Sequence, residues 1–494
     1  MYHAESFAKL EFETFVVGYD GATPVPSLLS MSHVQFFYLA QLPALLRVLP
    51  FLLLAPLKIA HQICTILHTL LWRIPYSPEF IVVQNPPSIP TLALVALVSA
   101  LRGSKVIIDW HNLGYSILAL KLGPKHPLVR LAERFESTFG QKAFAHLFVT
   151  QAMRDHLVKA WNLQGLKAVL HDRPPAHFRR SPPSEVHQLF VRLAPSLPTA
   201  FLPTYHTPFS TPFTSVSGHV PQPSALGDVA TDSFANSPPP EELSMPELRQ
   251  DRPALVVSST SWTPDEDFGI LLDALAAYEA RARVLNGTGG QLPKMLMVVT
   301  GKGPDRARYM EKVGRMQRGD AGAKPWAWVR CVSLWLEAED YPVLLGSADV
   351  GVSLHASSSA LDLPMKVVDM FGCGLPVCAL DFACLPELVR DGKNGLVFKD
   401  AHELAGHLET LLTGFPKISP MLGKLRAALE PSPDTVAAPT SAARTMGLGV
   451  EREWGSWDQN WGAVVRPLLY GSRIGASEVM GSSQAGGEEI QKIH

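Results

Sequence analysis

Short runs of apolar residues alternate along the first third of the chain with stretches in which apolar residues recur every three or four positions. The first pattern is typical of strands buried in a parallel sheet, and the second is typical of amphipathic helices. A helix is expected where Leu128, Leu131, Phe135 and Phe139 share one face, with Gly140 as its C-cap. The expected strands are Thr14–Gly18, Phe80–Gln84, Lys105–Asp109 and Leu147–Thr150.

The same alternation returns after residue 250, where helices are expected over Phe268–Ala280 and Met365–Phe371. A chain of 494 residues is too long for one hydrophobic core, since single domains stop growing at about 250–300 residues. The pattern therefore predicts an α/β fold with two doubly wound domains, over residues 1–180 and 251–415. The strands expected in the second domain are Ala254–Ser259, Met295–Thr300, Trp328–Ser333, Asp349–Leu354 and Pro376–Leu380.

Residues 181–250 are rich in Pro, Ser and Thr, and such a composition buries too little apolar area to offset the entropy of the chain. We therefore expect a disordered insert between the domains. A second loose insert is expected over residues 416–450. A helix over residues 451–470 is expected to cross back to the first domain, and residues 471–494 are expected to form a disordered tail.

The Leu-rich segment Tyr38–Trp72 is interrupted by prolines and charged residues, and it contains no run of the ~20 apolar residues that a membrane-spanning helix needs. Two interpretations stay open at this point. The segment forms helices buried in the domain core, or it forms an apolar and basic surface that rests on a membrane, with Arg47, Lys58 and Arg73 near lipid headgroups.

Composition excludes several classes of protein. The hydrophobic fraction of 47% and the charged fraction of 18% are those of a globular protein. Lys plus Arg number 43 and Asp plus Glu number 45, so no general attraction to nucleic acid is expected. The five cysteines include no CxxC pair and no zinc-type cluster, which favours a reducing compartment. Residues 1–15 lack the apolar region of a signal peptide or anchor.

The segment Ala348–Phe398 carries the most informative chemistry. A strand ends at Leu354, a polar loop follows, and a helix begins near Pro364, where unpaired N–H groups attract phosphate. Lys366 adds positive charge in the first turn, and Asp369 is placed to accept hydrogen bonds from sugar hydroxyls. The alternative is a helix capped by serine with a solvated lysine. The loop offers hydroxyl donors from Ser357, Ser358 and Ser359.

This segment resembles the nucleotide-binding half of GT-B glycosyltransferases, with Asp369 where the family has an acidic residue that holds the ribose. The match continues through Gly374-Leu375-Pro376, then Pro386-Glu387, then Asp391-Gly392-Lys393-Asn394-Gly395. Further stretches are similar to the chitobiosyldiphosphodolichol β-mannosyltransferase family and together cover most of both domains. They are Gln84–Thr91, Ile108–Ser116, Asp172–Pro175, Ser259–Phe268 and Leu363–Gly372.

The resemblance implies a GT-B fold, in which two Rossmann-like domains face a cleft. It implies transfer of mannose, with inversion, from GDP-mannose to the terminal GlcNAc of chitobiosyl-diphosphate-dolichol, an early step of lipid-linked oligosaccharide synthesis for N-glycosylation. The implied location is the cytosolic face of the endoplasmic reticulum membrane. The implied partners are the donor, the lipid-linked acceptor, the membrane surface and other early mannosyltransferases. No tightly bound cofactor and no nucleic acid is expected.

Inverting transfer needs a base for the acceptor hydroxyl and positive groups for the departing diphosphate. His111 is our candidate base because it follows a buried strand where a parallel sheet opens its crevice. Asp109 is a competing base, and a structural histidine bonded to backbone is the alternative. The expected donor-binding residues are Gly301, Lys302, Gly303, Ser357, Ser358, Ser359, Leu363, Pro364, Met365, Lys366, Val367, Asp369 and Glu387.

The resemblance also implies residues on the acceptor side of the cleft. These are Tyr115, Ser261, Trp262, Thr263 and Asp265. The Asp265-Glu266-Asp267 triplet has the D-x-D form of a metal site, but its place at a helix entry favours capping by Asp265 and Glu266. We therefore expect no metal ligands, and no divalent metal requirement for donor binding.

The sequence departs from the family at two places. The family's membrane anchor, first strand and Gly-rich loop have no counterpart before Met1, so uncovered strand edges are expected in the first domain. Ala360 stands where the family usually has Gly. Two other functions therefore stay open beside the mannosyltransferase: a GT-B enzyme with a different, soluble acceptor, and a catalytically impaired scaffold subunit of a mannosyltransferase complex.

Overall fold

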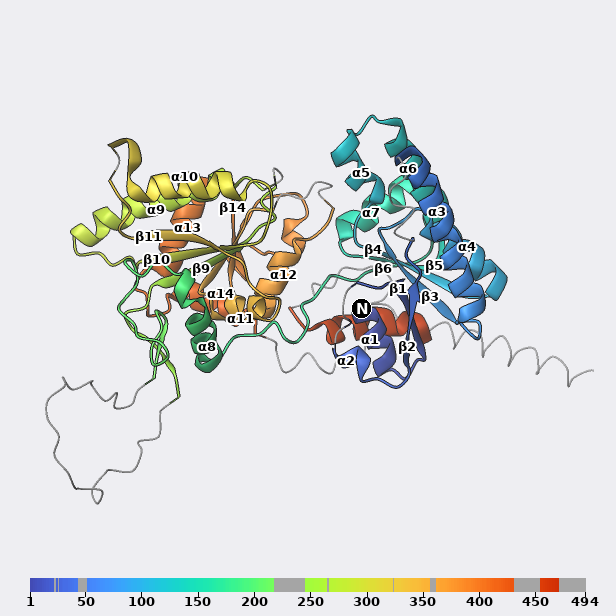
Figure 1. Ribbon diagram of the computed structural model, residues 1–494, viewed down its shortest axis with the longest axis horizontal. Helices are drawn as coiled ribbons and strands as arrows, with labels where there is room; N and C mark the ends of the chain where they lie inside the picture. Colours follow the sequence, from blue (N-terminus) through green and yellow to red (C-terminus); the bar gives the residue numbers. More distant parts are fainter. Residues whose placement is uncertain are drawn as a thin grey trace, which may run out of the picture. The chain divides into compact units, whose positions relative to one another are not determined.

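The computed structural model describes residues 1–21, 24, 26–42, 51–216, 245–263, 266–322, 324–355, 361–430 and 454–470. The chain forms two compact units (Figure 1). Unit 1 comprises residues 1–172, 358–363 and 433–494, and unit 2 comprises residues 173–357 and 364–432. The chain thus leaves unit 1 inside the Asp172–Pro175 motif, earlier than the boundary at residue 180 that composition indicated.

Unit 1 contains a four-stranded parallel sheet of order β3-β4-β5-β6 and a separate parallel pair, β1 and β2. Among the described residues, no hydrogen-bonded ladder joins this pair to the larger sheet. The strands are β1 (Thr14–Tyr19), β2 (Val34–Leu39), β3 (Phe80–Asn85), β4 (Lys105–Trp110), β5 (Lys142–Phe148) and β6 (Gln164–Val169). The helices are α1 (Tyr2–Lys9), α2 (Pro26–Leu29), α3 (Phe51–His68), continued by a π-helical turn (Thr69–Arg73), α4 (Thr91–Arg102), α5 (Gly114–Leu122), α6 (Pro127–Gly140), α7 (Gln151–Trp161) and residues 457–470.

The first three strands predicted from the sequence are confirmed as β1, β3 and β4. The fourth, Leu147–Thr150, is wrong in its bounds, because β5 ends at Phe148 and Thr150 is instead the N-cap of α7. The Thr150 hydroxyl accepts a hydrogen bond from the N–H of Met153 at 3.0 Å. This side chain satisfies one of the unpaired donors of the helix start, which ends the strand pattern there.

The C-terminal helix expected over residues 451–470 is present over residues 457–470, and residues 451–453 lie outside the described chain. It packs within unit 1, where Trp461 and Val465 join Phe7, Ile107 and Leu147 in one hydrophobic cluster. Burial of such side chains contributes roughly 1.5–3 kcal/mol each. The helix therefore stabilises the first domain although it lies at the end of the sequence.

Helix α6 buries a different face from the one that the apolar pattern indicated. Leu128 and Leu131 are exposed, whereas Val129, Ala132 and Glu136 are buried. Gly140 is the last helical residue, and the C-cap is Gln141. A Cβ atom on Gly140 would lie 2.6 Å from the indole of Trp110. This glycine is needed for close packing of the helix on β4.

Unit 2 contains a six-stranded parallel sheet of order β11-β10-β9-β12-β13-β14, the order of a Rossmann sheet. Figure 1 shows α9, α10 and α13 on one side of the strands and α8, α11 and α12 on the other. The sheet strands are β9 (Ala254–Ser259), β10 (Met295–Thr300), β11 (Val329–Leu334), β12 (Val350–Ser353), β13 (Val377–Leu380) and β14 (Gly395–Phe398). The helices are α8 (Pro183–Leu193), α9 (Phe268–Gly287), α10 (Arg306–Arg318), α11 (Asp340–Ser347), α12 (Met365–Gly372), α13 (Ala401–Leu412) and α14 (Pro420–Ala427), with 3-10 turns at Ala194–Ser196, Asp320–Gly322 and Leu385–Glu387.

The expectation of a disordered insert over residues 181–250 is wrong for its first half. Helix α8 buries Leu189 and Phe190, and the Phe190 ring lies 4.2 Å from that of Phe213, centroid to centroid. A short antiparallel pair follows, β7 (Thr214–Ser215) with β8 (Glu247–Leu248). The Pro and Ser content of the whole segment masked this amphipathic helix. Residues 217–244 lie outside the described chain.

The second loose insert, expected over residues 416–450, is also wrong in part. Helix α14 buries Leu422 and Leu425, and Arg426 donates to the Asp349 carbonyl at 3.3 Å. Residues 431–450 and the expected tail, residues 471–494, lie outside the described chain.

The Leu-rich segment begins at the end of β2 and, from Phe51, forms α3 and the π-helical turn; residues 43–50, with Arg47 among them, lie outside the described residues. Ile66 packs with Leu39 and Leu94, so part of this helix belongs to the core as one interpretation held. Arg73 donates to the Tyr38 carbonyl at 2.9 Å. Within the described ranges, no helix combines the length and the apolar character needed to cross a membrane.

Candidate functional site

In unit 1, a buried carboxylate binds two imidazoles at the carboxyl end of β4. The Nε2 atom of His111 lies 2.7 Å from Oδ2 of Asp109, and Nε2 of His3 lies 3.0 Å from the same oxygen. The indole N–H of Trp461 donates to Nδ1 of His3 at 3.0 Å. Because indole only donates, His3 carries its proton on Nε2 and donates it to Asp109. Asp109 is 2% exposed, so it acts on His111 and has no access to a ligand.

The pKa values follow from this geometry. Burial opposes ionisation of Asp109, but the adjacent imidazoles of His3 and His111 outweigh burial and hold its pKa well below the usual range. Burial lowers the pKa of His111, but the hydrogen bond and charge of Asp109 and the charge of Asp172 outweigh it and raise the pKa to about 9. The His111 ring is therefore mostly protonated at neutral pH.

His111 presents its other nitrogen to Asp172 and to solvent. The Nδ1 atom lies 3.6 Å from Oδ2 of Asp172, and the His111 side chain is 27% exposed. The His111 side chain thus contacts two carboxylates, whereas the alternative of a structural histidine predicted a hydrogen bond to the backbone. Tyr115 is half-buried near Trp161, and burial, followed by the charges of Glu133 and Glu136, raises the pKa of its hydroxyl to about 12.

A second buried carboxylate, Glu136 of α6, organises the loops that carry these residues. Its Oε1 atom accepts from Asn85 Nδ2 at 3.1 Å, from Ser88 Oγ at 2.7 Å and from the Gly114 N–H at 2.9 Å. Its Oε2 atom accepts from the Tyr115 N–H at 3.1 Å. Glu136 thereby connects two motifs of the family resemblance. It also provides acceptors for the backbone N–H groups at the start of α5, which have no partner within the helix. No sequence motif assigned this role to Glu136, although a glutamate on the same helix face as Val129 and Gly140 was a visible signal.

In unit 2, the loop after β9 and the first turn of α12 meet at Glu266. Its carboxylate accepts from the Thr260 hydroxyl and, at 2.8 Å, from the Ser261 N–H. Its other oxygen, Oε1, binds the ammonium of Lys366. Strands β9 and β12 are where the strand order of the sheet reverses, and ligands of such sheets bind outside the carboxyl ends of the strands at that point.

Lys366 and Asp369 lie in the first turns of α12, at the same end of the sheet. The Lys366 side chain is 27% exposed, whereas that of Glu266 is 3% exposed, so the lysine reaches solvent from a buried anchor. Burial raises the pKa of Asp369 to about 7. Lys366 thus provides a fixed cation, and Asp369 provides a carboxyl group that titrates near neutral pH, at the same end of the sheet.

The other residues expected around this helix divide into exposed and buried groups. Met365 is exposed, and Pro364 is the N-cap residue. Leu363 is buried, and the expectation that Val367 contacts a donor is wrong for its side chain, which is buried in the core. The Val367 N–H also bonds the Pro364 carbonyl at 2.9 Å. Ser357, Ser358 and Ser359, together with Ala360, lie outside the described residues.

The Gly301-Lys302-Gly303 loop follows β10 and presses against the loop after β9. A Cβ atom on Gly301 or Gly303 would lie 1.8 Å from the carbonyl oxygen of Thr260 or Ser261, respectively. These glycines are therefore needed for loop packing, a structural reason that the motif alone did not indicate. Lys302 is exposed, and its ammonium lies 3.6 Å from the ring centroid of Trp335.

The acceptor-side expectations for unit 2 need correction. Trp262 has φ +49° and is 1% exposed, and its indole N–H donates to the Gly301 carbonyl at 3.1 Å. It is a core residue and presents no side chain to a ligand, whereas Ser261 is exposed and Thr263 is partly exposed. Asp265 lies outside the described residues.

The capping explanation for the acidic triplet is wrong for Glu266, the one of its two residues that the structure describes. The N-cap of α9 is Asp267, which accepts from the Gly269 N–H at 2.9 Å. Glu266 instead holds Lys366. Across the described parts of the chain, no group of three or more His, Cys, Asp or Glu side chains is arranged to hold a metal ion.

The Asp391–Gly395 motif forms a turn before β14. Asn394 accepts from the Arg390 N–H at 2.8 Å and donates to the Leu388 carbonyl at 3.1 Å, so this part of the motif shapes the loop. Glu387 is partly exposed in the preceding 3-10 turn.

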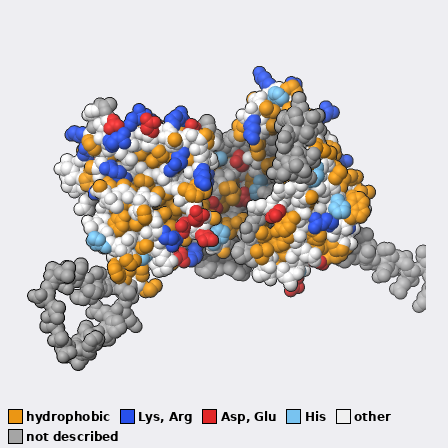
Figure 2. Space-filling model, in the orientation of Figure 1, with side chains coloured by type: hydrophobic (Ala, Val, Ile, Leu, Met, Phe, Trp, Pro, Cys, Tyr) orange, Lys and Arg blue, Asp and Glu red, His pale blue; other side chains and the backbone are white. Residues whose placement is uncertain are grey.

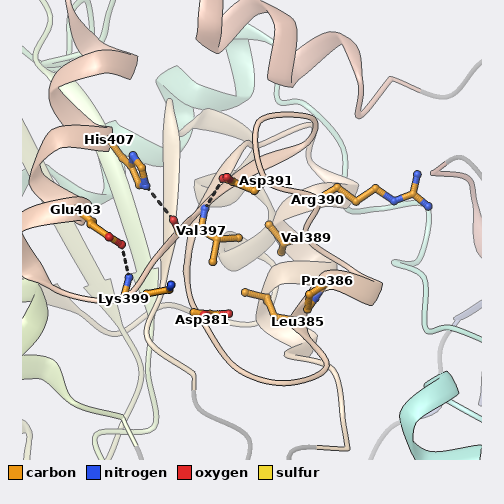
Figure 3. A pocket seen from close by; sticks show the side chains of 10 residues that line it. All are labelled: Asp381, Leu385, Pro386, Val389, Arg390, Asp391, Val397, Lys399, Glu403 and His407. Carbon is orange, nitrogen blue, oxygen red and sulfur yellow. Dashed lines mark hydrogen bonds between the residues drawn. The ribbon is translucent and has the colours of Figure 1, made fainter. Parts of the chain in front are cut away.

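A pocket of about 550 Å³ lies beside β14 (Figure 3). Its polar groups hold the strand: Glu403 accepts from the Lys399 N–H at 2.8 Å, and Asp391 accepts from the Val397 N–H at 2.9 Å. None of the residues predicted to bind the donor lines it. Its lining comprises Asp381, Leu385, Pro386, Val389, Arg390, Asp391, Val397, Lys399, Glu403 and His407.

Comparison with known proteins places this geometry in a family context. Residues 2–171 match a glycosyl transferase 4-like domain, and residues 255–414 match glycosyl transferases group 1. The chitobiosyldiphosphodolichol beta-mannosyltransferase of Mus musculus is 40% identical over 473 residues, which is 96% of this chain and 86% of the mouse protein. The protein of the same name from Yarrowia lipolytica is 35% identical over 477 residues, covering 95% and 82% of the two chains.

One further relative is named for a nucleotide, and one solved structure shows the fold. The UDP-glycosyltransferase TURAN of Arabidopsis thaliana is 37% identical over 487 residues, covering 95% of this chain and 93% of that protein. The structure of Anabaena Alr3699/HepE in complex with UDP-glucose is similar with a TM-score of 0.50 and 16% identity, and covers 87% of this chain and 90% of that chain. At this identity the likeness shows the fold alone: two Rossmann-like domains of the GT-B class.

Proposed function

This chain belongs to the chitobiosyldiphosphodolichol β-mannosyltransferase family, and from that membership we propose that it transfers mannose from GDP-mannose to chitobiosyl-diphosphate-dolichol. The product is Man-β-1,4-GlcNAc2-diphosphate-dolichol, formed with inversion at the anomeric carbon. The acceptor oxygen attacks that carbon, and the bond to the diphosphate breaks with its electron pair leaving on GDP.

The observation that carries the donor half of this proposal is the Lys366–Glu266 ion pair at the point where the strand order of unit 2 reverses. Glu266 fixes the ammonium of Lys366 at the end of the sheet where nucleotides bind in Rossmann folds. When a donor binds, Lys366 and the N-terminal end of α12 stabilise the negative charge on the departing diphosphate. Lys302, in the loop after the neighbouring strand β10, is proposed to add a second positive charge. We propose that these groups bind the donor without a divalent metal.

For the acceptor half, we propose His111 as the base and Asp109 as its positioning residue. Asp109 holds the Nε2–H of His111, so the acceptor proton goes to Nδ1. Asp172, 3.6 Å from Nδ1, stabilises the imidazolium that forms. Asp109 is too buried to take the proton itself. The raised pKa of His111 means that the enzyme must lose a proton from this ring before each transfer.

The nucleotide of the donor is the finer part of the proposal. The name of TURAN refers to UDP, and the HepE complex contains UDP-glucose, whereas the mannosyltransferase relatives are named for mannose transfer. We propose guanosine diphosphate, and Asp369 as the residue that accepts hydrogen bonds from the ribose hydroxyls. We also propose that the enzyme works on the cytosolic face of the endoplasmic reticulum membrane beside other early mannosyltransferases.

The test is transfer from radiolabelled GDP-mannose to a chitobiosyl-diphosphate lipid by the full-length chain, with the human relative assayed in parallel. We expect a trisaccharide lipid whose label is released by β-mannosidase and not by α-mannosidase. UDP-glucose and UDP-mannose should give no product. Absence of a labelled lipid while the human relative is active would contradict the proposed reaction. Binding of GDP without any transfer would point to the scaffold function instead.

A further inference from the structure

Helix α5 is an apolar helix that buries none of its residues. Its sequence is GYSILALKL, and the exposed side chains include Ile117, Leu120 at 65% and Leu122. An amphipathic surface helix normally turns such residues inward, because each exposed leucine forgoes roughly 1.5–3 kcal/mol of burial. The exposed apolar side chains of α5 therefore indicate a binding partner.

Helix α6 extends this surface. Leu128 is 53% exposed and Leu131 is 62% exposed, whereas Val129 and Ala132 on the adjacent stripe are buried. The helix is thus already packed through one face, and its exposed leucines form a second apolar face. Figure 1 shows α5 and α6 together at one end of unit 1. We call these two helices the α5–α6 hairpin.

The charges on the hairpin are almost all positive. Glu136 is buried, so Glu133 is the exposed acid among residues 114–140, all of which the structure describes. Figure 2 shows Lys and Arg side chains beside hydrophobic side chains at this end of unit 1. The exposed basic residues of the hairpin are Lys121, Lys125, Arg130 and Arg134.

We propose that the α5–α6 hairpin docks on an anionic lipid bilayer, with its exposed leucines in the headgroup region and its basic residues on lipid phosphates. Apolar side chains beside Lys and Arg are the composition of interfacial helices, which bury their apolar face about 5–10 Å into the headgroup boundary. This inference rests on the proposed function, because it supplies a route by which unit 1 meets a lipid-linked acceptor.

Two comparisons favour a membrane over another occupant. A second copy of the hairpin would bring like charges together around the leucines, which opposes self-association. Helix α10 of unit 2 is also basic, but among its residues no large hydrophobic side chain is exposed. Its charged residues therefore form an ordinary solvated face. The hairpin combines both features, and that combination fits a surface with an apolar interior and negative headgroups.

The hairpin also continues directly from the candidate base. Helix α5 begins at Gly114, immediately after the loop that carries His111, and Glu136 of α6 holds that helix start. Its 9 residues extend about 14 Å from this loop. Docking of the hairpin would therefore hold the acceptor-side residues within reach of a saccharide attached to a lipid diphosphate.

The experiment is flotation of the full-length chain with vesicles of phosphatidylcholine and phosphatidylserine, and with vesicles of phosphatidylcholine alone. One variant changes apolar contacts, Leu120→Ser with Leu128→Ser and Leu131→Ser. Its control changes similarly exposed residues of unit 2, Met245→Ser with Val284→Ser and Ile418→Ser. A second variant, Lys121→Glu with Lys125→Glu, is matched by Lys312→Glu with Arg315→Glu on α10.

We expect the wild type and both controls to float with phosphatidylserine vesicles. Each lysine near such a surface contributes about 1 kcal/mol to the free energy of binding. The lysine variant changes two of them, so it should bind at least about 30-fold more weakly. The leucine variant should bind at least about tenfold more weakly to both vesicle types. Equal binding by wild type and hairpin variants would overturn the proposal. So would self-association that the leucine variant abolishes, measured by sedimentation.

Turnover separates this inference from the proposed function. With the acceptor dissolved in detergent, the hairpin variants should transfer mannose at the wild-type rate. With the acceptor in vesicles, they should lose transfer in proportion to binding. If the wild type transfers no mannose under either condition, the proposed function fails while flotation still decides the docking surface. If the variants lose transfer equally in detergent and in vesicles, the hairpin has a catalytic or folding role and the docking proposal is wrong.

Discussion

The Nε2 atom of His111 lies 2.7 Å from Oδ2 of Asp109, in the loop that leads from β4 into α5. Asp109 accepts a second hydrogen bond from His3, so two segments that are distant in the sequence meet at one buried oxygen. This arrangement fixes the orientation of the His111 ring and leaves Nδ1 as the atom that takes a proton. It also raises the pKa of that ring to about 9.

The first prediction concerns the pH dependence of transfer. Below pH 9 most His111 rings are protonated, so the fraction able to act as a base rises with pH. With GDP-mannose saturating at every pH, so that Asp369 does not contribute, we expect kcat/KM for the lipid acceptor to rise about tenfold per pH unit from pH 6 to 8 and to level off near pH 9, because this ratio reports the enzyme before the acceptor binds. His111→Gln should lower kcat by about 100-fold or more and remove this rise.

Asp109→Asn provides the control for that profile. Loss of the carboxylate should bring the pKa of His111 down toward its ordinary value, so the plateau should begin at a lower pH. Its maximum should also fall, because the amide no longer fixes the proton on Nε2. A level profile from pH 6 to 9 in the wild type would show that His111 is not the base.

The second prediction concerns Glu136. Glu136→Ala leaves the donors of Asn85, Ser88 and the Gly114 and Tyr115 backbone without their acceptor. We expect a loss of about 3 kcal/mol or more in the free energy of unfolding, which lowers the thermal midpoint by roughly 5–10 °C. Glu133→Ala, on the exposed side of the same helix, should change the midpoint by less than about 1 °C. Equal midpoints for the two variants would contradict the role of Glu136.

The third prediction uses Asp369, whose pKa burial raises to about 7. If its carboxylate accepts hydrogen bonds from the ribose, GDP should bind more tightly above pH 7 and lose up to about tenfold per unit below it. Asp369→Asn should weaken GDP binding at pH 8, and the ratio of wild-type to variant affinity should shrink toward pH 6. Titration of GDP itself affects its binding to both proteins equally, so it cancels in the ratio of the two affinities. A ratio independent of pH would exclude this contact.

The same residue allows a check on stability. A buried carboxyl whose pKa is raised binds its proton more tightly in the folded state, so its contribution is favourable at low pH and is lost as the pH rises through about 7. We therefore expect Asp369→Asn to raise the unfolding midpoint at pH 8 and to leave it nearly unchanged at pH 4. A lower midpoint at pH 8 would show that the carboxylate is stabilised by a contact within the protein.

The sequence predicted most accurately the strands that are buried on both faces of a sheet. Strands β9 and β10 were predicted with correct bounds, because central strands covered on both faces are continuous apolar runs. Strands β6 and β14 were not predicted: β6, QGLKAV, contains no run of more than two apolar residues, and β14, GLVF, is only 4 residues long. Helix α8 was missed since the composition of residues 181–250 was averaged over a segment that is partly ordered.

For the candidate site, motifs located residues but not their partners. Lys366 was identified from its place in the first turn of a predicted helix, and His111 from its place after a buried strand, whereas Glu266, Glu136 and His3 were not given their roles. The reason is physical: Lys366 and Glu266 are 100 positions apart, and His3 and Asp109 are 106 positions apart. Only the folded chain brings such residues together, and only burial shows that Trp262 belongs to the core.

The fourth prediction separates the two roles of Lys366. Lys366→Met leaves the Glu266 carboxylate buried without its cation, which should cost about 3–5 kcal/mol of stability. Adding Glu266→Gln removes the uncompensated charge, so the double variant should recover stability to within about 1 kcal/mol of the wild type. Lys312→Met, on α10, is the control for loss of a surface lysine. Thermal unfolding measures the recovery.

Calorimetric titration of GDP into the wild type and into this stable double variant tests the donor site most directly. A charged hydrogen bond to the diphosphate contributes roughly 1.5–3 kcal/mol, so we predict binding about 10-fold to 100-fold weaker in the double variant, with UDP binding weakly to both proteins. The Lys312→Met control should bind GDP as the wild type does. Unchanged GDP affinity in the double variant, or tighter binding of UDP than of GDP by the wild type, would contradict the account.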